Sequence, residues 1–235
     1  MTVSLRSPRA RALFSFAALP LAAASFAACT EGGGGGAVGG GGGGGGGCTP
    51  VEVISARGTT EPQTGSMIMG GLSRGIASRV GGNVYEVQYP SSAEYLSSPQ
   101  IGVTDTLNRI KARAAACPNQ KYVLNGYSKG GIVMTDVMKK ISPDLGAKVK
   151  AVVMYGNPYY KANQPEAAGS AKGGTARGIY PGMGVPASWS ARTKDFCNQG
   201  DPVCGAGANI MMHLAYGSTA QADGIAFAVG KVNAG

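Results

Sequence analysis

The stretch Gly126-Tyr127-Ser128-Lys129-Gly130 decides the fold class of this chain, because an apolar run precedes it and a helical pattern follows it. The apolar run covers residues 122–124, and the helical spacing of apolar residues covers residues 131–140. A Gly-x-Ser-x-Gly sequence between a strand and a helix predicts a sharp turn that lifts the serine hydroxyl above a sheet. The pattern alone is weak in a chain with 40 glycines, so its position between strand and helix carries the argument.

Short apolar runs and longer helical patterns alternate on both sides of this stretch. Such alternation predicts an α/β fold, with a central, mostly parallel five-stranded sheet and helices on both faces. Ligands bind such sheets at the carboxyl ends of the strands, so we expect the catalytic residues in the loops that follow the strands. We expect strands at residues 51–56, 84–89, 122–125, 151–155 and 193–196, and helices at residues 67–79, 101–116, 130–141 and 220–232.

His213 is the only histidine of the sequence, and a nucleophilic Ser128 needs a base to remove its proton. A lone histidine is usually a structural residue. In the α/β-hydrolase fold, however, the catalytic residues follow the order serine, acid, histidine, and His213 lies where that order requires the base. We therefore interpret Ser128 as the nucleophile and His213 as the base.

The acid that orients His213 should lie in a loop after a late strand. Asp201 is favoured because it lies between Cys197 and Cys204, where a short disulfide ring would hold its carboxylate in place. Asp195 is the alternative, although it falls inside an expected strand. The remaining candidates, which we interpret as ordinary charged residues, are Asp136, Asp144 and Glu166.

Four cysteines fall within the expected folded part, and an even number indicates two disulfides in an oxidising compartment. Of three possible connectivities, a bridge between Cys197 and Cys204 closes a short loop. Cys48 and Cys117 would then tie the first strand to a later helix end. With a single histidine and no closely spaced cysteine pair beside it, the sequence predicts no metal site and no cofactor.

The N-terminal segment has the composition of a secretory signal peptide, because three arginines precede an apolar stretch at residues 12–28. That stretch is short for a membrane span and contains Pro20. We expect a signal peptide at residues 1–28, a glycine-rich disordered linker at residues 29–47 and a catalytic domain at residues 48–235. Alternatively, Cys29 carries a lipid anchor, since residues 26–29 weakly match a lipoprotein cleavage box.

The formal net charge of +9 invites a nucleic-acid interpretation, but three of these charges lie in the expected signal peptide. The other basic residues are scattered, without interleaved aromatic residues, so we expect no nucleic-acid partner. No later segment is long and apolar enough to span a bilayer. The sequence thus predicts a secreted, extracellular monomer without a transmembrane segment.

Four motifs of the chain resemble those of cutinases, and the resemblance extends over residues 48–232. They are Arg57-Gly58-Thr59-Thr60-Glu61-Pro62, Gly126-Tyr127-Ser128, Gly200-Asp201-Pro202-Val203-Cys204 and His213-Leu214-Ala215-Tyr216-Gly217. The resemblance implies a small, lidless α/β-hydrolase that cleaves the polyester cutin and short soluble esters. It also implies Ser128, Asp201 and His213 as the catalytic triad. Thr59 and the backbone N–H of Lys129 would form the oxyanion hole, although cutinases usually have glutamine at the position of Lys129.

The expected substrate is an ester, and cutin-like polyester is the first choice. Acetylated xylan is the second, since acetylxylan esterases share the fold and triad, and a lipid ester is a further alternative. The apolar residues 210–212, just before His213, suit aliphatic acyl chains. Residues 157–188 contain no amphipathic helix that could form a lid, so we expect Ser128 to be open to solvent. A non-catalytic, surface-tethered binding protein is a remote alternative, supported only by the polyglycine.

Overall fold

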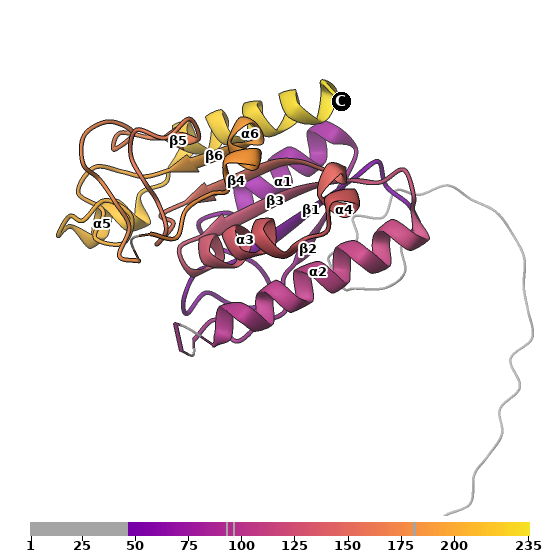
Figure 1. The fold of residues 1–235 in the computed structure, drawn as a ribbon, viewed down its shortest axis with the longest axis horizontal. Coiled ribbons are helices and arrows are strands. Elements are labelled where there is room, and N and C mark those ends of the chain that lie inside the picture. Colours follow the sequence, from indigo (N-terminus) through magenta and orange to yellow (C-terminus); the bar gives the residue numbers. More distant parts are fainter. Residues whose placement is uncertain (1–46, 93, 96, 181) are drawn as a thin grey trace, which may run out of the picture. The chain divides into compact units, whose positions relative to one another are not determined.

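A six-stranded, entirely parallel sheet in the order β2-β1-β3-β4-β6-β5 forms the centre of the protein (Figure 1). The computed structural model describes residues 47–92, 94–95, 97–180 and 182–235, so the expected signal peptide and almost all of the linker lie outside the described residues. The strands are β1 (Val51–Ala56), β2 (Asn83–Glu86), β3 (Lys121–Tyr127), β4 (Val149–Tyr155), β5 (Ala167–Ala168) and β6 (Thr193–Phe196).

Helices cover both faces of this sheet. Successive residues of a strand point to opposite faces, so each strand contributes side chains to both helical layers. Val53 and Val153 pack toward α1 (Gly70–Val80) and α6 (Ser218–Asn233). Their neighbours Ile54 and Val152 pack on the other face, toward α2 (Ser98–Ala116) and α3 (Lys129–Lys140). All four side chains are fully buried, so the centre of the sheet is hydrophobic on both sides, as expected for a parallel sheet.

The α/β fold class is confirmed, whereas the expected number of strands is wrong by one. The additional strand, β5, has only two residues and pairs with the edge of β6, so its sequence carries no strand pattern. Strand β2 ends earlier than expected, because the carbonyls of Val87 and Tyr89 accept hydrogen bonds from the Arg57 guanidinium. Three helical segments were missed because they are too short to show a helical period: α4 (Pro143–Lys148), the 3-10 helix η1 (Ala187–Arg192) and α5 (Ile210–Leu214).

Two disulfides staple the fold, and both have the pairing that we expected. Cys48, which precedes β1, is bonded to Cys117 at the end of α2. Cys197 follows β6 directly and is bonded to Cys204, seven residues further along the chain. The described ranges contain no helix that is long and apolar enough to cross a membrane.

Candidate active site

Ser128 occupies the sharp turn between β3 and α3, with the unusual backbone angles φ 52° and ψ −118°. The flanking positions must be glycine, because the backbone around them leaves no room for a Cβ atom. A Cβ atom on Gly126 would lie 2.5 Å from the carbonyl oxygen of Gly130, and one on Gly130 would lie 1.9 Å from that of Ala56. The strained turn is therefore held by close backbone packing, and it presents the serine at the N-terminus of α3, where negative charge is favoured.

Three side chains are in contact one after another, beginning at Ser128 Oγ. His213 Nε2 lies 2.9 Å from Ser128 Oγ, and His213 Nδ1 lies 2.9 Å from Asp201 Oδ2. The three residues come from α3's N-terminus, from α5 and from the loop after β6, so the fold brings together residues that are far apart in the sequence. This arrangement suits transfer of a proton from the serine to an imidazole that is oriented by a carboxylate.

The Asp201 carboxylate is fully buried and accepts hydrogen bonds on both oxygens. Oδ1 accepts from the backbone N–H groups of Val203 (2.7 Å) and Cys204 (3.2 Å), inside the disulfide loop. Oδ2 accepts from the Tyr216 hydroxyl at 2.7 Å, in addition to its contact with His213. Burial raises the pKa of Asp201, but these hydrogen bonds and the nearby His213 outweigh burial and lower the pKa below its ordinary value. Asp201 is therefore held as a carboxylate.

The His213 ring is fixed by its neighbours as well as by Asp201. It stacks on the Tyr127 ring with a centroid distance of 5.1 Å, and the Tyr127 hydroxyl donates to the His213 carbonyl at 2.9 Å. Gly156 has a positive φ of 60°, and a Cβ atom there would lie 2.6 Å from the imidazole. Close packing by Tyr127 and Gly156 thus restricts the rotation of the ring.

The loop that carries Thr59 is pinned by a buried Arg57 and a buried Glu61. The Glu61 carboxylate accepts from the backbone N–H of Gly58 at 2.6 Å and from the Ser66 hydroxyl at 2.9 Å. The Arg57 side chain donates to the Glu61 carbonyl at 2.9 Å. Both ends of this short loop are therefore held, and Thr59 lies between them, with its Oγ1 3.4 Å from the Tyr95 hydroxyl.

Lys129 follows Ser128, and its side chain reaches Ser91 and Ser98. The residue is 0% exposed. Its Nζ donates to the Ser91 carbonyl (3.0 Å) and to the Ser98 hydroxyl (3.3 Å), and it lies 4.8 Å from the centroid of the Tyr95 ring. Burial lowers the pKa of the Lys129 ammonium. The ammonium therefore ties Ser91 and Ser98 to α3, while the backbone N–H of the same residue belongs to the first turn of that helix.

Replacing Lys129 by methionine should lower stability more than catalysis. Lys129→Met removes the ammonium donor from the Ser91 carbonyl and the Ser98 hydroxyl, which should lower the free energy of unfolding by about 1–3 kcal/mol. Denaturant unfolding measures this loss, and Lys129→Gln, which keeps a donor, should lose less. The kcat of Lys129→Met should stay within about tenfold of wild type. A fall of about 10²–10³-fold, typical of a lost oxyanion donor, would instead mean that the ammonium acts on the reacting atoms.

The structure does not bring Asp195, the alternative acid, to His213. Asp195 is buried on β6, where its Oδ2 accepts from Asn157 Nδ2 at 2.9 Å and its Oδ1 has no partner among the described residues. Burial raises the pKa of Asp195 to about 8, and the nearby Glu166 adds to the increase, whereas the Asn157 hydrogen bond opposes it. Asp195 is therefore mostly protonated near neutral pH.

This raised pKa predicts a pH-dependent stability. An unfolded aspartate loses its proton near pH 3.9, whereas folded Asp195 keeps it up to about pH 8. The folded state binds more protons across this interval, so its stability falls as the pH rises. Asp195→Asn cannot ionise. We therefore compare the melting temperature of the variant minus that of wild type at pH 5 and at pH 8.5. This difference should be larger at pH 8.5 by at least about 2–4 °C, which is the shift that 1 kcal/mol produces in a domain of this size. If the difference in melting temperature were the same at both pH values, the raised pKa of Asp195 would be contradicted.

Ser128 is less accessible than the sequence led us to expect. Only 4% of the residue is exposed, so the expectation that it is open to solvent is wrong. Its N–H donates to the Tyr155 carbonyl at 2.9 Å and its carbonyl accepts from Gly131 at 2.8 Å, which encloses the turn. On the other hand, residues 157–180 and 182–186 contain no helix that could close over the site.

Exposed apolar side chains surround His213 on the short helix α5. Ile210 is 55% exposed, Met211 is 60% exposed and Leu214 is 48% exposed, whereas His213 itself is buried. The same helix therefore supplies the candidate base and an apolar surface beside it. Exposed apolar groups of this kind mark surfaces that contact other apolar matter.

Some residues of the site carried no signal in the sequence analysis. Tyr216 lay within a quoted motif, but nothing in its spacing indicated that its hydroxyl would donate to Asp201.

Cys197, Asp201 and Cys204 lie close enough together to resemble a metal site. Both sulfurs are in a disulfide and the carboxylate is already hydrogen-bonded, so this group fits a covalent staple better than a set of metal ligands.

Comparisons with known proteins show which proteins this chain is similar to. The family model described as Cutinase matches residues 47–232. The chain is 32% identical over 184 residues to Carboxylesterase Culp1 of Mycobacterium tuberculosis, covering 74% of this chain and 79% of that protein. It is 33% identical over 181 residues to Cutinase of Monilinia fructicola, covering 74% and 80%. Among solved structures, an iodinated complex of acetyl xylan esterase superposes with a TM-score of 0.69 at 26% identity, covering 79% of this chain and 99% of the other.

Proposed function

The chain belongs to the cutinase family, and on this premise we propose that it is a secreted serine esterase that works through an acyl-enzyme on Ser128. The observation that carries the proposal is the unbroken contact from Ser128 Oγ through His213 to Asp201, with both distances at 2.9 Å. A serine hydroxyl becomes a useful nucleophile only beside such a base.

In the proposed reaction, Ser128 Oγ attacks the ester carbonyl while His213 Nε2 accepts the serine proton. Asp201 stabilises the imidazolium that forms and keeps it in the productive orientation. The negative charge on the carbonyl oxygen is stabilised by the backbone N–H of Lys129 and by Thr59. His213 then donates its proton to the leaving alcohol, and a water molecule, activated by the same base, releases the acid from Ser128.

Cutin-like polyester is the substrate that the surroundings of the site support best. The exposed apolar residues of α5 lie beside the candidate base, where they can contact an insoluble aliphatic chain. The absence of a helix from the described parts of residues 157–186 also favours action without a moving lid. Acetylated xylan is the second candidate, because of the likeness to an acetyl xylan esterase structure.

We also propose that residues 1–28 direct secretion and that residues 29–47 are a linker ahead of the catalytic domain. Two disulfides support an oxidising compartment, as in secreted proteins. A lipid on Cys29 remains the alternative form of the same N-terminus. Mass spectrometry of the mature protein distinguishes cleavage at this point from acylation.

The test of the substrate is a comparison of initial rates on cutin, acetylxylan and a soluble butyrate ester, with Ser128→Ala as the blank. We expect hydrolysis of cutin and of the dissolved ester. We also expect a smooth dependence on butyrate concentration through the solubility limit. A sharp increase in rate when droplets form would show gating by an interface, and deacetylation of xylan without cutin hydrolysis would favour the second candidate.

A further inference from the structure

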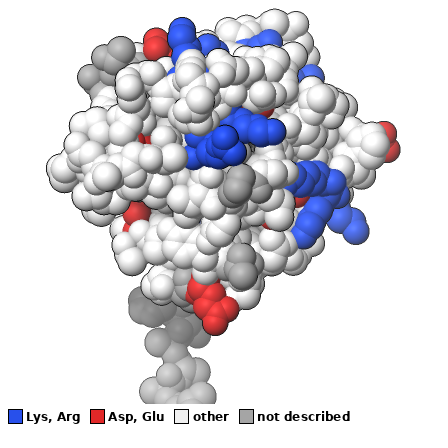
Figure 2. All heavy atoms as spheres, turned by 60° about the vertical axis from the view of Figure 1, so that its left-hand side comes forward, with Lys and Arg blue, Asp and Glu red and all other residues white. Residues whose placement is uncertain are grey.

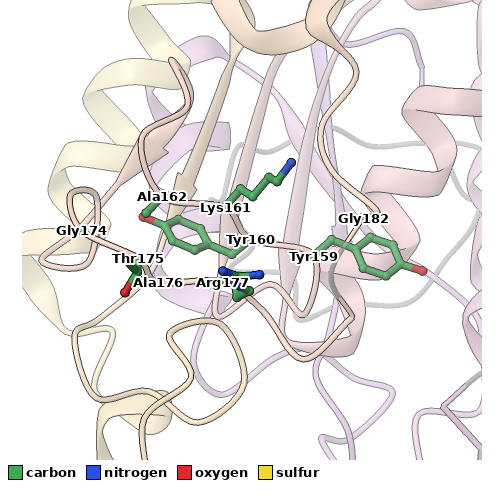
Figure 3. Close-up of a pocket in the computed structure, with 9 residues that line it drawn as sticks. All are labelled: Tyr159, Tyr160, Lys161, Ala162, Gly174, Thr175, Ala176, Arg177 and Gly182. Carbon is green, nitrogen blue, oxygen red and sulfur yellow. The ribbon is translucent and has the colours of Figure 1, made fainter.

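A cavity of about 490 Å³ lies in the loops that follow β4 (Figure 3). Its lining includes the rings of Tyr159 and Tyr160 and the side chains of Lys161 and Arg177. None of the described residues that line it is acidic. The triad does not use any of these residues, so the cavity is separate from the catalytic site.

The walls of this cavity are preformed by backbone hydrogen bonds between two segments of the loops. Ala162 donates to the Ala176 carbonyl at 2.9 Å, and Gly178 donates to the Tyr160 carbonyl at 2.9 Å. Between these bonds, Lys161 and Arg177 form an antiparallel bridge. A cavity framed in this way loses little entropy when a ligand binds.

The bridge places two cations directly opposite each other, an arrangement that ordinarily destabilises a strand pair. Both residues are exposed, and neither forms an ion pair with an acidic group among the described residues. Two buried carboxylates, those of Asp195 and Glu166, lie near the Tyr160 hydroxyl, but neither of them lines the cavity. Figure 2 shows Lys and Arg side chains spread over the face turned forward, with fewer Asp and Glu side chains among them. An anion in the cavity would relieve the repulsion between Lys161 and Arg177.

A row of tyrosines connects this cavity with the loop that carries Thr59. The Tyr159 ring meets the Tyr180 ring edge-on at 6.2 Å, and Tyr180 lies 6.3 Å from the Tyr95 ring. The Tyr95 hydroxyl in turn contacts Thr59 Oγ1 at 3.4 Å. A molecule that lies along these rings can reach from the cavity toward Thr59, which we propose as an oxyanion donor for the reaction at Ser128.

We propose that the cavity binds an anionic group, a phosphate or a carboxylate, of the ester substrate while its ester bond lies at Ser128. Arg177 supplies a planar, two-pronged donor that matches either anion, and Lys161 supplies a second charge. The inference rests on the proposed esterase function and adds a preference for acidic esters over neutral esters of the same acid.

The experiment compares three butyrate esters whose chain is long enough to follow the row of tyrosines and which differ only at its far end: 12-hydroxydodecyl butyrate, which is neutral, its 12-phosphate and 12-(butyryloxy)dodecanoic acid. Wild-type enzyme should have a higher kcat/KM for one or both anionic esters than for the neutral ester, mainly through a lower KM, and added salt should reduce this advantage. A preference for one of the two anionic esters shows whether the cavity binds a phosphate or a carboxylate, and either result supports the proposal.

Variants Lys161→Gln and Arg177→Gln should each lower kcat/KM for the preferred anionic ester about tenfold, as expected for one lost charge-assisted contact, without changing hydrolysis of the neutral ester. Lys111→Gln, which removes an exposed charge from α2, is the matched control and should change neither. Equal rates of wild-type enzyme on all three esters would overturn the inference, as would equal losses in Lys111→Gln. Failure to hydrolyse even the neutral ester would instead contradict the proposed function.

Discussion

Ser128→Ala and His213→Ala are each expected to lower kcat on a soluble ester by a factor on the order of 10⁶, and the double variant should lose no more than either one alone. The 2.9 Å contact between Ser128 Oγ and His213 Nε2 is the physical reason, because the nucleophile and its base act as one unit. Steady-state kinetics with a butyrate ester measure the effect, and thermal unfolding verifies that each variant is folded.

Ser188→Ala is the matched control for this experiment, since Ser188 is an exposed serine in η1 and should be replaceable without loss. If the losses of the two single variants multiplied in the double variant, Ser128 and His213 would act independently. If His213→Ala retained more than about a hundredth of the wild-type kcat, the base would have to be sought elsewhere.

Asp201→Asn is expected to lower kcat by about 10⁴-fold, the next largest effect. The introduced amide can donate a hydrogen bond to His213 Nδ1, which would leave the proton on Nε2, the nitrogen that must accept from Ser128. The variant also loses the negative charge that stabilises the imidazolium. Because the oxygen of the introduced amide can still accept from Val203 and Cys204, the loop should keep its fold, so the loss should appear in kcat rather than in stability.

Asp195→Asn supplies the comparison for that variant, because it makes the same chemical change in a buried carboxylate that contacts Asn157 rather than His213. Its kcat should remain close to wild type, while its stability shows the altered pH dependence described above. A loss in Asp195→Asn as large as that in Asp201→Asn would undermine the choice between the two acids.

Much of the fold is readable from local sequence because its signals are periodic or sterically strict. The two turn glycines leave no room for a Cβ atom, so the Gly-x-Ser-x-Gly pattern identifies the strand-turn-helix unit directly. The buried strand β4 is a near-continuous apolar run, as a parallel strand covered on both faces requires. Asp201 was favoured for its place between two cysteines, and the structure does place it inside their disulfide loop.

Features that depend on where a long side chain turns could not be read in this way. The ammonium of Lys129 points to Ser91 and Ser98, which lie 38 and 31 positions earlier, and nothing in the local sequence specifies that direction. The exposure of Ser128 was misjudged, because counting residues between the catalytic groups says nothing about how closely the turn is packed. The short helix α5, which carries His213, is likewise determined by tertiary contacts rather than by a helical period.

Labelling with a fluorophosphonate, followed by peptide mapping, tests the central claim most directly, because such a probe reacts with a serine only where a base activates it. We expect a single adduct per chain, on the peptide that contains Ser128, with activity lost in proportion to labelling. His213→Ala should label far more slowly although Ser128 is still present. An adduct on another residue, or full activity after complete labelling of Ser128, would contradict the assignment of Ser128 as the nucleophile.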